Sequence, residues 1–494
     1  MKLFIVLLTG AFMLATGTSD VFAKKKEKVQ TEAKSDTVQT ASKKRNTQYP
    51  RLFKNKRVVT KKGLITIHKI DDKLYFEFPK SLLGREFLMG SSISATSDNT
   101  SGLVGQTMTT PLHIRFAIQE DQVYMQNVTP VSRMDVYSNQ SDISKAVAKS
   151  NITPDMESFK IAAYNMDSTA VVFEVTKFFL ADNKRLPLFD QNSSSLEDEK
   201  YGQLELKAVL KKNLSSIRNF YVFDDNLEIN LDMSFYQSLL ASKKEVRGGN
   251  VRVKAVYSML LLPEETMVWR LGDPRLGYTF TKKQKISTEK DGTAFSYLQH
   301  KWNLLPADEE AYRRGDLVAP RKPVVFYIDS DFPEAWKKAI KEGVNWWNEA
   351  FKMAGFKDAV QTADFPANDT TFYAGNLKYS CIRYVPVNLS KTQSKVWVDP
   401  RSGEIINGTI FVGHDIAKTI ASQRFVQTAQ VDERMRGIQL SEEVLLEGIR
   451  LYVAREVGHC LGLADNASAS AAFSVESLRS PEFTRQNGIA SSVM

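Results

Sequence analysis

The stretch Arg455-Glu-Val-Gly-His-Cys-Leu-Gly-Leu-Ala-Asp465 is the most informative part of this chain. It closes a segment, residues 442–461, that the sequence predicts to be one long helix. Ser441 is a typical N-cap, the two glutamates after it suit the positive end of the helix dipole, and Gly462 is a typical helix stop. The pattern therefore predicts a helix with ionisable side chains in its last two turns and a sharp turn directly after them.

The residues upstream of this helix predict an alternation of strands and helices. A buried strand at Pro323–Ile328 precedes a helix from Pro333 to Ala354, whose apolar residues recur at helical spacing. Further strands are expected around 380–385, 395–398 and 405–412. The expected fold class is α+β, with β-rich N-terminal domains ahead of this mixed region.

The 455–465 stretch resembles the H-E-x-x-H-x-x-G-x-x-H motif of metzincin zinc proteases. Arg455 stands at the first histidine position of that motif and Asp465 at the third. The order of strands and helices is also that of a metzincin catalytic domain. Further segments resemble the exported zinc-dependent metalloproteases common in Bacteroidota, namely Gly272–Tyr278, Lys322–Phe356, Val398–Ile405, Asn466–Thr484 and Ser492–Met494.

The resemblance implies a role for each residue of the motif. Glu456 corresponds to the general base, His459 to a zinc ligand and Asp465 to the third ligand, because a carboxylate oxygen can also bind zinc. Arg455 cannot be a ligand, since its guanidinium is always charged and has no lone pair to donate. We therefore expect Arg455 to pair with Asp465 or Glu456 in place of the metal, and zinc to be weakly bound or absent. His414, a spare imidazole nearby in sequence, is expected to be structural.

The same resemblance predicts where a peptide or protein substrate or ligand would bind. In such enzymes an extended peptide pairs with the edge strand of the sheet, which is expected here within 405–412. The expected contacts are Ile405, Ile406, Thr409 and Ile410. Met494 corresponds to the Met-turn methionine beneath the metal, so the catalytic domain is expected to be incomplete at its C-terminus.

Residues 58–310 predict a β-rich region with recurrent short strands. The clearest strands are 64–68, 74–78, 112–116, 122–125, 170–175 and 251–257. The expected organisation is a signal peptide at 1–23, a basic disordered linker at 24–50, a small β domain at 51–95, a β-rich domain at 96–315 and the metzincin-like domain at 316–494.

The N-terminus predicts export. Lys2 precedes a short apolar run, Leu3–Ala15, and Val21-Phe-Ala23 fits a cleavage site. Of the net charge of +9, residues 24–45 carry +5 and residues 46–62 carry +6, which leaves −2 for the rest. The basic arm is interpreted as a solvated linker, with contact to an anionic membrane or cell-surface polymer as the alternative. We expect no membrane span and no nucleic acid partner, and a location in the periplasm, on the cell surface or outside the cell.

The chain has two cysteines, Cys381 and Cys460. An exported protein could join them in a disulfide. Both lie in apolar segments, one on a predicted strand and one on a predicted helix, so two buried thiols are the favoured interpretation.

Three functions are compatible with the sequence. The replaced ligands at Arg455 and Asp465 favour a catalytically impaired protease or a pseudoprotease that binds peptide without cleaving it. The first alternative is an active metalloendopeptidase with a degenerate zinc site, built on His459, Asp465 and a further group. The second is a non-enzymatic surface binding protein, in which the β-rich region carries the function.

Overall fold

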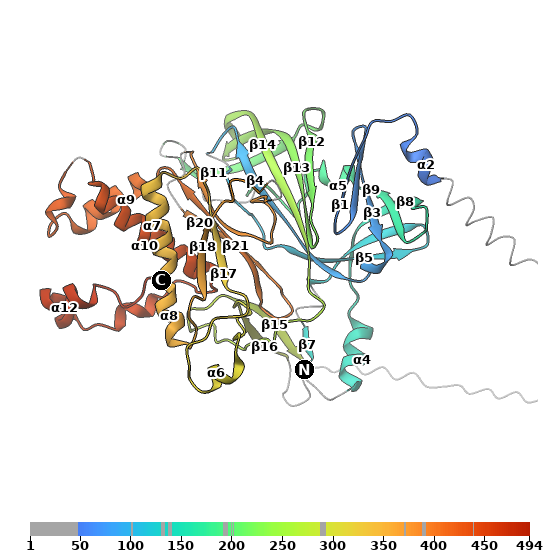
Figure 1. The fold of residues 1–494 in the computed structure, drawn as a ribbon. Coiled ribbons are helices and arrows are strands. Elements are labelled where there is room, and N and C mark those ends of the chain that lie inside the picture. The colour runs from blue at the N-terminus through green and yellow to red at the C-terminus, as the bar shows by residue number, and fades with distance from the viewer. Residues whose placement is uncertain are drawn as a thin grey trace, which may run out of the picture.

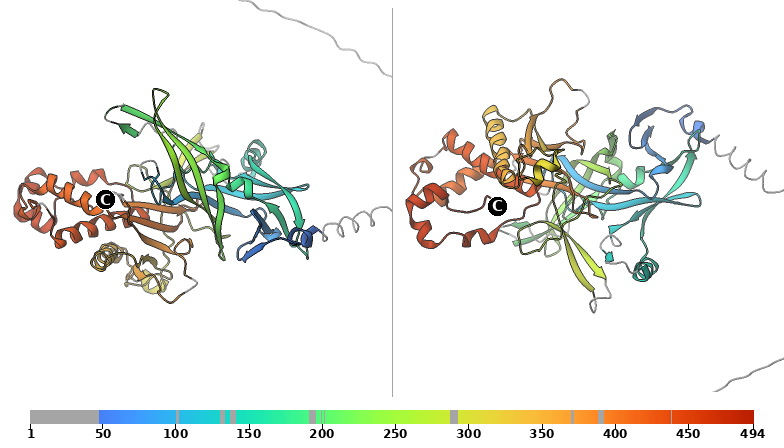
Figure 2. Two further views of the ribbon diagram at one scale, coloured as in Figure 1. Left: turned by 90° about the horizontal axis from the view of Figure 1, so that it is seen from above. Right: turned by 60° about the horizontal axis from the view of Figure 1, so that its bottom comes forward.

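The computed structural model describes residues 48–99, 102–129, 134–136, 141–190, 196–198, 200, 202–286, 293–369, 372–387, 392–437 and 439–494. The predicted signal peptide and nearly all of the predicted linker lie outside the described residues. The chain is α+β, as predicted. Figures 1 and 2 show β-sheets in the middle of an elongated molecule and the C-terminal helices at one end.

The larger sheet has thirteen strands and accounts for most of the N-terminal half. Its order is β1-β2-β3-β9-β8-β6-β5-β4-β14-β13-β11-β10, and β12 pairs with β13. The bounds are β1 Val58–Lys62, β2 Thr66–Ile70, β3 Lys73–Pro79, β4 Glu86–Thr96, β5 Leu112–Gln119, β6 Gln122–Asn127, β8 Asp155–Tyr164, β9 Ala170–Glu174, β10 Leu196–Asp198, β11 Gly202–Leu210, β12 Ser216–Val222, β13 Asn226–Ala241 and β14 Lys244–Leu261. The predicted strands in this region are confirmed, including the 66–79 hairpin with its turn at Asp71.

This sheet does not break at residue 95, where the predicted boundary between two β domains lies. β4 spans that boundary and pairs with β5 on one side and β14 on the other. Buried side chains from both segments, including Phe78 and Phe116 with ring centroids 4.8 Å apart, form one apolar core. Residues 51–95 and 96–261 therefore contribute to one sheet.

A small three-stranded sheet and short helices connect the larger elements. The sheet comprises β7 Met134–Val136, β15 Phe280–Ile286 and β16 Thr293–Gln299. The short helices are α2 Gln48–Phe53, α4 Ser141–Ser150, α5 Thr176–Phe179, α6 Glu309–Arg313 and the 3-10 turns η1 Lys80–Leu82 and η2 Lys212–Leu214.

The C-terminal region is built on a five-stranded sheet in the order β18-β17-β19-β21-β20. These strands are β17 Val324–Ile328, β18 Val360–Asp364, β19 Ser380–Val385, β20 Thr392–Val398 and β21 Ile405–Gly413. Neighbouring strands are parallel except β20, which pairs antiparallel with β21. β20 is therefore the edge strand, and the prediction that the edge lies within 405–412 is wrong.

The sequence carries the physical reason for this order. β21 contains the apolar run Ile410-Phe-Val412, which is typical of a strand buried on both faces inside a sheet. β20 starts with Thr392-Gln-Ser-Lys395, and polar side chains of this kind are typical of an exposed edge.

The helices of this region are α7 Glu334–Asn345, α8 Trp347–Met353, α9 Ile416–Thr428, α10 Glu442–Cys460, α11 Val475–Arg479 and α12 Pro481–Asn487, with the turns η3 Glu433–Met435 and η4 Ala467–Ala471. Buried side chains of α7, α9 and α10 pack against one face of the sheet, and α12 lies away from it (Figure 1). The single helix predicted from Pro333 to Ala354 is two helices, because the bond from Glu349 N to Trp346 O spans three residues and tightens the chain there. α7 and α10 touch backbone to backbone, since a Cβ on Gly343 would lie 2.5 Å from the carbonyl oxygen of Arg450.

The opposite face of the five-stranded sheet lies against the thirteen-stranded sheet. Alternation along β21 sends Ile410 into the core beneath the helices, and Phe411 to the other side, where it packs with Leu103 and Val104. Trp397 of β20 packs against leucines of both sheets. Figure 1 shows the resulting layers, with helices, the smaller sheet and the larger sheet in turn.

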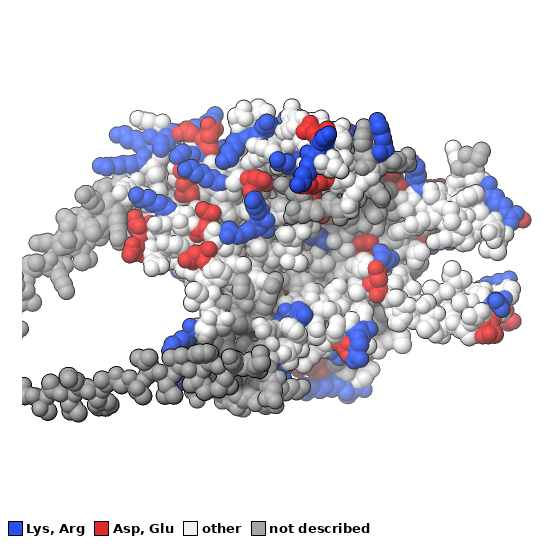
Figure 3. Space-filling view, turned by 180° about the vertical axis from the view of Figure 1, so that it is seen from behind, with Lys and Arg blue, Asp and Glu red and all other residues white. Residues whose placement is uncertain are grey.

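Both cysteines are buried and free, as predicted. Burial raises the pKa of the Cys381 thiol to about 12 and also raises that of Cys460. On the face shown in Figure 3, Lys and Arg are interspersed with Asp and Glu. Among the described residues, no helix is both long and apolar enough to cross a membrane.

Candidate functional site

The candidate site lies at the C-terminal end of α10, where the sequence places its ionisable residues. The helix begins as predicted, with the Ser441 hydroxyl accepting a hydrogen bond from the Val444 amide at 3.4 Å. It ends with two backbone bonds, from Gly462 N to His459 O and from Leu463 N to Gly458 O, each 3.0 Å. This pair of bonds is a Schellman motif, which needs a residue with positive φ, and Gly462 has φ +96°.

Arg455 lies between the two carboxylates of the motif. Its Nη2 donates to Asp465 Oδ1 at 2.5 Å, and its Nη1 lies 3.5 Å from Glu456 Oε1. The expected ion pair is therefore present, and the closer partner is Asp465. The side chains of Arg455 and Asp465 are 38% and 69% exposed, so the pair lies at the surface of the pocket rather than inside it.

His459 is held in one orientation by the chain that follows the helix. Its Nδ1 donates to the carbonyl oxygen of Leu463 at 2.9 Å. That bond leaves Nε2 facing Asp465, whose Oδ1 is 3.6 Å away. A backbone carbonyl on one ring nitrogen is also how ligand histidines are commonly oriented, so His459 keeps the geometry of a ligand.

Glu456 is buried and reaches across to the edge strand. Its Oε1 accepts a hydrogen bond from the hydroxyl of Thr392, the first residue of β20, at 3.1 Å. Glu456 therefore lies between Arg455 and β20. The sequence did not indicate Thr392, because a single threonine at the start of a strand carries no signal of its partner.

Met494 lies beneath the last turns of α10. A Cβ added to Gly458 would lie 2.3 Å from the Met494 sulfur, so the thioether packs directly on the helix beside His459. The carbonyl of Met494 also accepts a bond from the Asn466 amide at 3.0 Å. The methionine therefore packs under the candidate site, on the helix that carries His459.

The segment Gly272–Tyr278 forms part of the same site. Tyr278 bridges to Leu463, Ala464 N donates to Gly277 O at 2.9 Å, and Thr279 N donates to Gly462 O at 2.8 Å. This segment therefore holds the turn that carries Asp465. The segment lies ahead of the predicted C-terminal domain at 316–494, and nothing local in its sequence shows that it pairs with residues almost two hundred positions later.

The four predicted substrate contacts do not form a binding edge. β21 lies between β19 and β20, so its backbone is already paired on both sides. Ile410 points into the core under the helices, Ile405 is buried, and Ile406 packs against the cluster around Trp397. Thr409 faces the opposite side of the sheet, toward the N-terminal sheet. Alternation along the strand separates Thr409 from Ile410, because successive side chains point to opposite faces. Ile406 departs from that alternation because the pairing of β21 with β20 shifts register beside it.

The residues at this site do not fit zinc. His459 and Asp465 are two donors, and no group of three His, Cys, Asp or Glu side chains that could hold a metal occurs among the described residues. Moreover, the Asp465 oxygen that faces His459 is bonded to a permanent cation, Arg455, which would repel a second one. His414 is engaged elsewhere, with its Nδ1 2.5 Å from the Tyr384 hydroxyl and its ring stacked on Trp336.

Comparison with known families matches three separate parts of the chain. Residues 437–494 match the family model described as Met-zincin. The C-terminal region is metzincin-like. Two domains of unknown function match further upstream, DUF5118 at residues 47–96 and DUF5117 at residues 105–307. Comparisons with curated proteins and with solved structures gave no match.

The Met-zincin match spans α10 and the chain up to Met494, which is the segment that carries Glu456, His459 and Asp465. It supports a zinc metalloprotease family for this region. Zinc is the metal that the family implies, and Arg455 and Asp465 stand at the positions that the sequence resemblance assigns to the first and third ligands.

Proposed function

We propose that this protein is a pseudoprotease of the metzincin type, whose site holds the guanidinium of Arg455 in place of a metal ion. The observation that carries the proposal is the bond from Arg455 to Asp465, with Glu456 on the other side of the same guanidinium. Without a cation, these two carboxylates would repel each other across the pocket. Arg455 supplies that positive charge from within the helix.

The proposal extends to a partner. Among the residues that the structure describes, β20 has a strand partner on one side only, and its first residue contacts Glu456. An extended peptide can add to such an edge through main-chain hydrogen bonds. We therefore assign peptide binding to β20, in place of the strand named from the sequence, and an exported location on the strength of the N-terminal sequence.

Zinc content tests the first part of the proposal. The purified protein is dialysed against micromolar zinc and then against metal-free buffer, and its zinc is measured by elemental analysis. We expect far less than one zinc per chain in the wild type, and about one in the double variant Arg455→His, Asp465→His, since three imidazoles then meet at one point. Adding His459→Ala to the double variant should abolish this zinc binding.

Two outcomes would contradict this proposal. About one zinc per wild-type chain, together with cleavage of casein, would show a working metalloprotease with a degenerate site. A folded double variant without zinc would show that Arg455 and Asp465 are not the reason why the wild type fails to bind zinc.

Hydrogen exchange tests whether β20 binds an extended peptide. We expect an unfolded protein, such as reduced and carboxymethylated lactalbumin, to slow exchange at the amides of β20 and to leave those of β18, the opposite edge, unchanged. Equal exchange at β20 with and without the unfolded protein would rule out this edge as the binding strand.

A further inference from the structure

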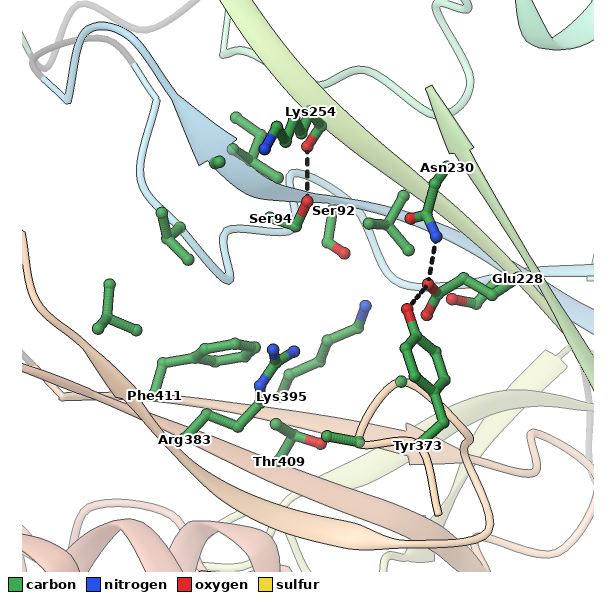
Figure 4. Close-up of a pocket in the computed structure, with 18 of the residues that line it drawn as sticks. Ser92, Ser94, Glu228, Asn230, Lys254, Tyr373, Arg383, Lys395, Thr409 and Phe411 are labelled. Carbon is green, nitrogen blue, oxygen red and sulfur yellow. Dashed lines mark hydrogen bonds between the residues drawn. The ribbon is translucent and has the colours of Figure 1, made fainter. Parts of the chain in front are cut away.

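A cavity lies between the two sheets, on the side of the five-stranded sheet that faces away from α10. Its volume is about 430 Å³, which is within the range of small-molecule pockets. Figure 4 shows that Lys395 and Arg383 point into it from the smaller sheet, while Ser92, Ser94 and Asn230 lie on the larger sheet across from them. The cavity is therefore separate from the site at Arg455.

Two cations on the floor of this cavity have no partner of opposite charge in contact. Arg383 of β19 and Lys395 of β20 make no hydrogen bond or ion pair with any of the described residues. The cation of Arg383 lies over the ring of Phe411 and that of Lys395 over the ring of Trp397. The undescribed residues next to the lining segments, 370–371 and 388–391, include no Asp or Glu. Both side chains are partly buried, so the lack of a counter-charge is costly.

The acidic group of the cavity is already engaged. Glu228 is buried, and its Oε1 accepts hydrogen bonds from the Tyr373 hydroxyl at 2.5 Å and from Asn230 Nδ2 at 2.8 Å. Burial raises the pKa of the Glu228 carboxyl, although the charges of Arg383 and Lys395 act in the opposite direction without forming an ion pair with it. Of the other charged residues that line the cavity, Lys254 and Arg218 are also basic, and Arg218 lies 3.6 Å from Asp232.

The wall that carries Tyr373 is fixed in place. The ring of Tyr373 stacks on Tyr221 of the larger sheet with centroids 4.1 Å apart, and Asn226 Nδ2 donates to Asn376 Oδ1 at 2.8 Å. These contacts join the loop after β18 to β12 and β13, so the cavity is formed before any ligand arrives. A preformed pocket loses less entropy on binding than one that must be ordered.

We propose that this cavity binds a small ligand in which an oxyanion, either a carboxylate or a phosphate, is attached to an apolar group. The planar fork of Arg383 can bond two oxygens of one anion, and Lys395 adds a second positive charge to the same space. Phe411 and Trp397 supply the apolar surface beside these cations. The cavity is larger than a bare phosphate needs, which favours an anion with such an attachment.

Calorimetric titration tests the proposal with two probes, phenyl phosphate and phenylacetate, at low ionic strength. We expect the wild type to bind at least one of them, and the relative affinity identifies phosphate or carboxylate as the preferred head group. Arg383→Gln should weaken binding tenfold or more. The matched control is Lys357→Gln, which removes one exposed cation of the same region far from the cavity lining and should leave the affinity unchanged.

A second variant separates binding from folding. Burial lowers the pKa of Lys395 to about 8, so its charge is present at neutral pH and opposes folding in the ligand-free protein. We expect Lys395→Met to abolish binding and at the same time to raise the Tm of the ligand-free protein, because an unpaired cation is removed without loss of packing volume.

The proposal is overturned if folded wild type binds neither probe. It is also overturned if Arg383→Gln and Lys395→Met, folded as judged by circular dichroism, bind the probes as tightly as Lys357→Gln does.

Discussion

At the scale of single residues, Arg455 decides what the site can do. Its guanidinium lies at the first ligand position and bonds Asp465, which holds the third. His459, the second, keeps the orientation of a ligand through its bond to the Leu463 carbonyl. A site with one intact imidazole, one carboxylate and one fixed cation is suited to electrostatic pairing, and it lacks the donors that hold a metal.

The exposure of this ion pair predicts a small effect on stability. Because both side chains of the Arg455–Asp465 pair are partly exposed, Arg455→Ala should lower the free energy of unfolding by about 1 kcal/mol or less. Urea unfolding measures the change. Arg275→Ala, which breaks an exposed pair with Asp273, is the matched control and should have a similarly small effect. A loss several times larger at Arg455 alone would show that the cation is essential for the fold.

The burial of His300 predicts that the stability of the fold depends on pH. Burial lowers the pKa of His300 to about 4, and its ring nitrogens contact the hydroxyls of Thr279 and Thr281. Between about pH 6.5 and pH 4 the unfolded chain binds the extra proton and the folded chain does not, so stability falls as the pH falls.

The variant His300→Gln removes this contribution. Between about pH 7 and pH 5 its free energy of unfolding should fall less than that of the wild type, by on the order of 2 kcal/mol. Chemical denaturation at each pH gives the difference. Parallel pH profiles for the two proteins would contradict the assignment.

At the scale of secondary-structure elements, the turn after α10 depends on Gly462. Gly462 has φ +96°, and a Cβ there would lie 2.3 Å from the carbonyl oxygen of His300. Two requirements therefore coincide at one glycine, the left-handed backbone of the helix stop and the close approach of the chain that leads out of β16. The turn that they create brings Asp465 back to Arg455.

A matched pair of variants separates the cost of the left-handed backbone from the cost of the close approach at Gly462. Gly315 has φ +91° and open space around it, so Gly315→Ala should cost about 1–2 kcal/mol from the backbone alone. Gly462→Ala adds a steric clash and should cost about 1–3 kcal/mol more. Thermal and urea unfolding of both variants give the comparison. Equal losses would mean that the approach of His300 is not tight.

At the scale of the whole molecule, the two sheets share an apolar contact. Trp397, 1% exposed, comes from the smaller sheet and packs on Leu88 and Leu260 of the larger one. A Cβ on Gly90 would lie 3.0 Å from its ring, so the larger sheet comes close at this point because it has no side chain there. The cavity with Arg383 and Lys395 exists because this contact holds the sheets together beside it.

This contact predicts that the sheets unfold together. Trp397→Ala should lower the free energy of unfolding by about 3–5 kcal/mol, since a large buried ring is lost from an interface that both sheets build. We expect one unfolding transition by circular dichroism and tryptophan fluorescence in the wild type. Trp346→Ala, at a site 47% exposed, is the control and should cost far less. Two separate transitions in the wild type would show that the sheets are independent.

The local features of this protein could be predicted from its amino-acid sequence. The bounds of α10, its Ser441 cap, its stop at Gly462 and the ionisable residues of its last turns were all predicted, because caps, glycine φ angles and helical spacing act over a few residues. The resemblance to the zinc motif predicted that Arg455 pairs with Asp465 or Glu456, and the structure shows Asp465 as the closer partner. The burial of both cysteines followed from the apolar segments around them.

Only the tertiary structure decided which distant segments meet. The order of strands made β20 the edge and β21 an interior strand, although the polar start of β20 was a signal that could have indicated it. The pairing of Tyr278 with Leu463 and the bond between Glu228 and Tyr373 join residues more than a hundred positions apart. Such contacts depend on how whole sheets pack, and the residues next to each partner in the sequence carry no record of it.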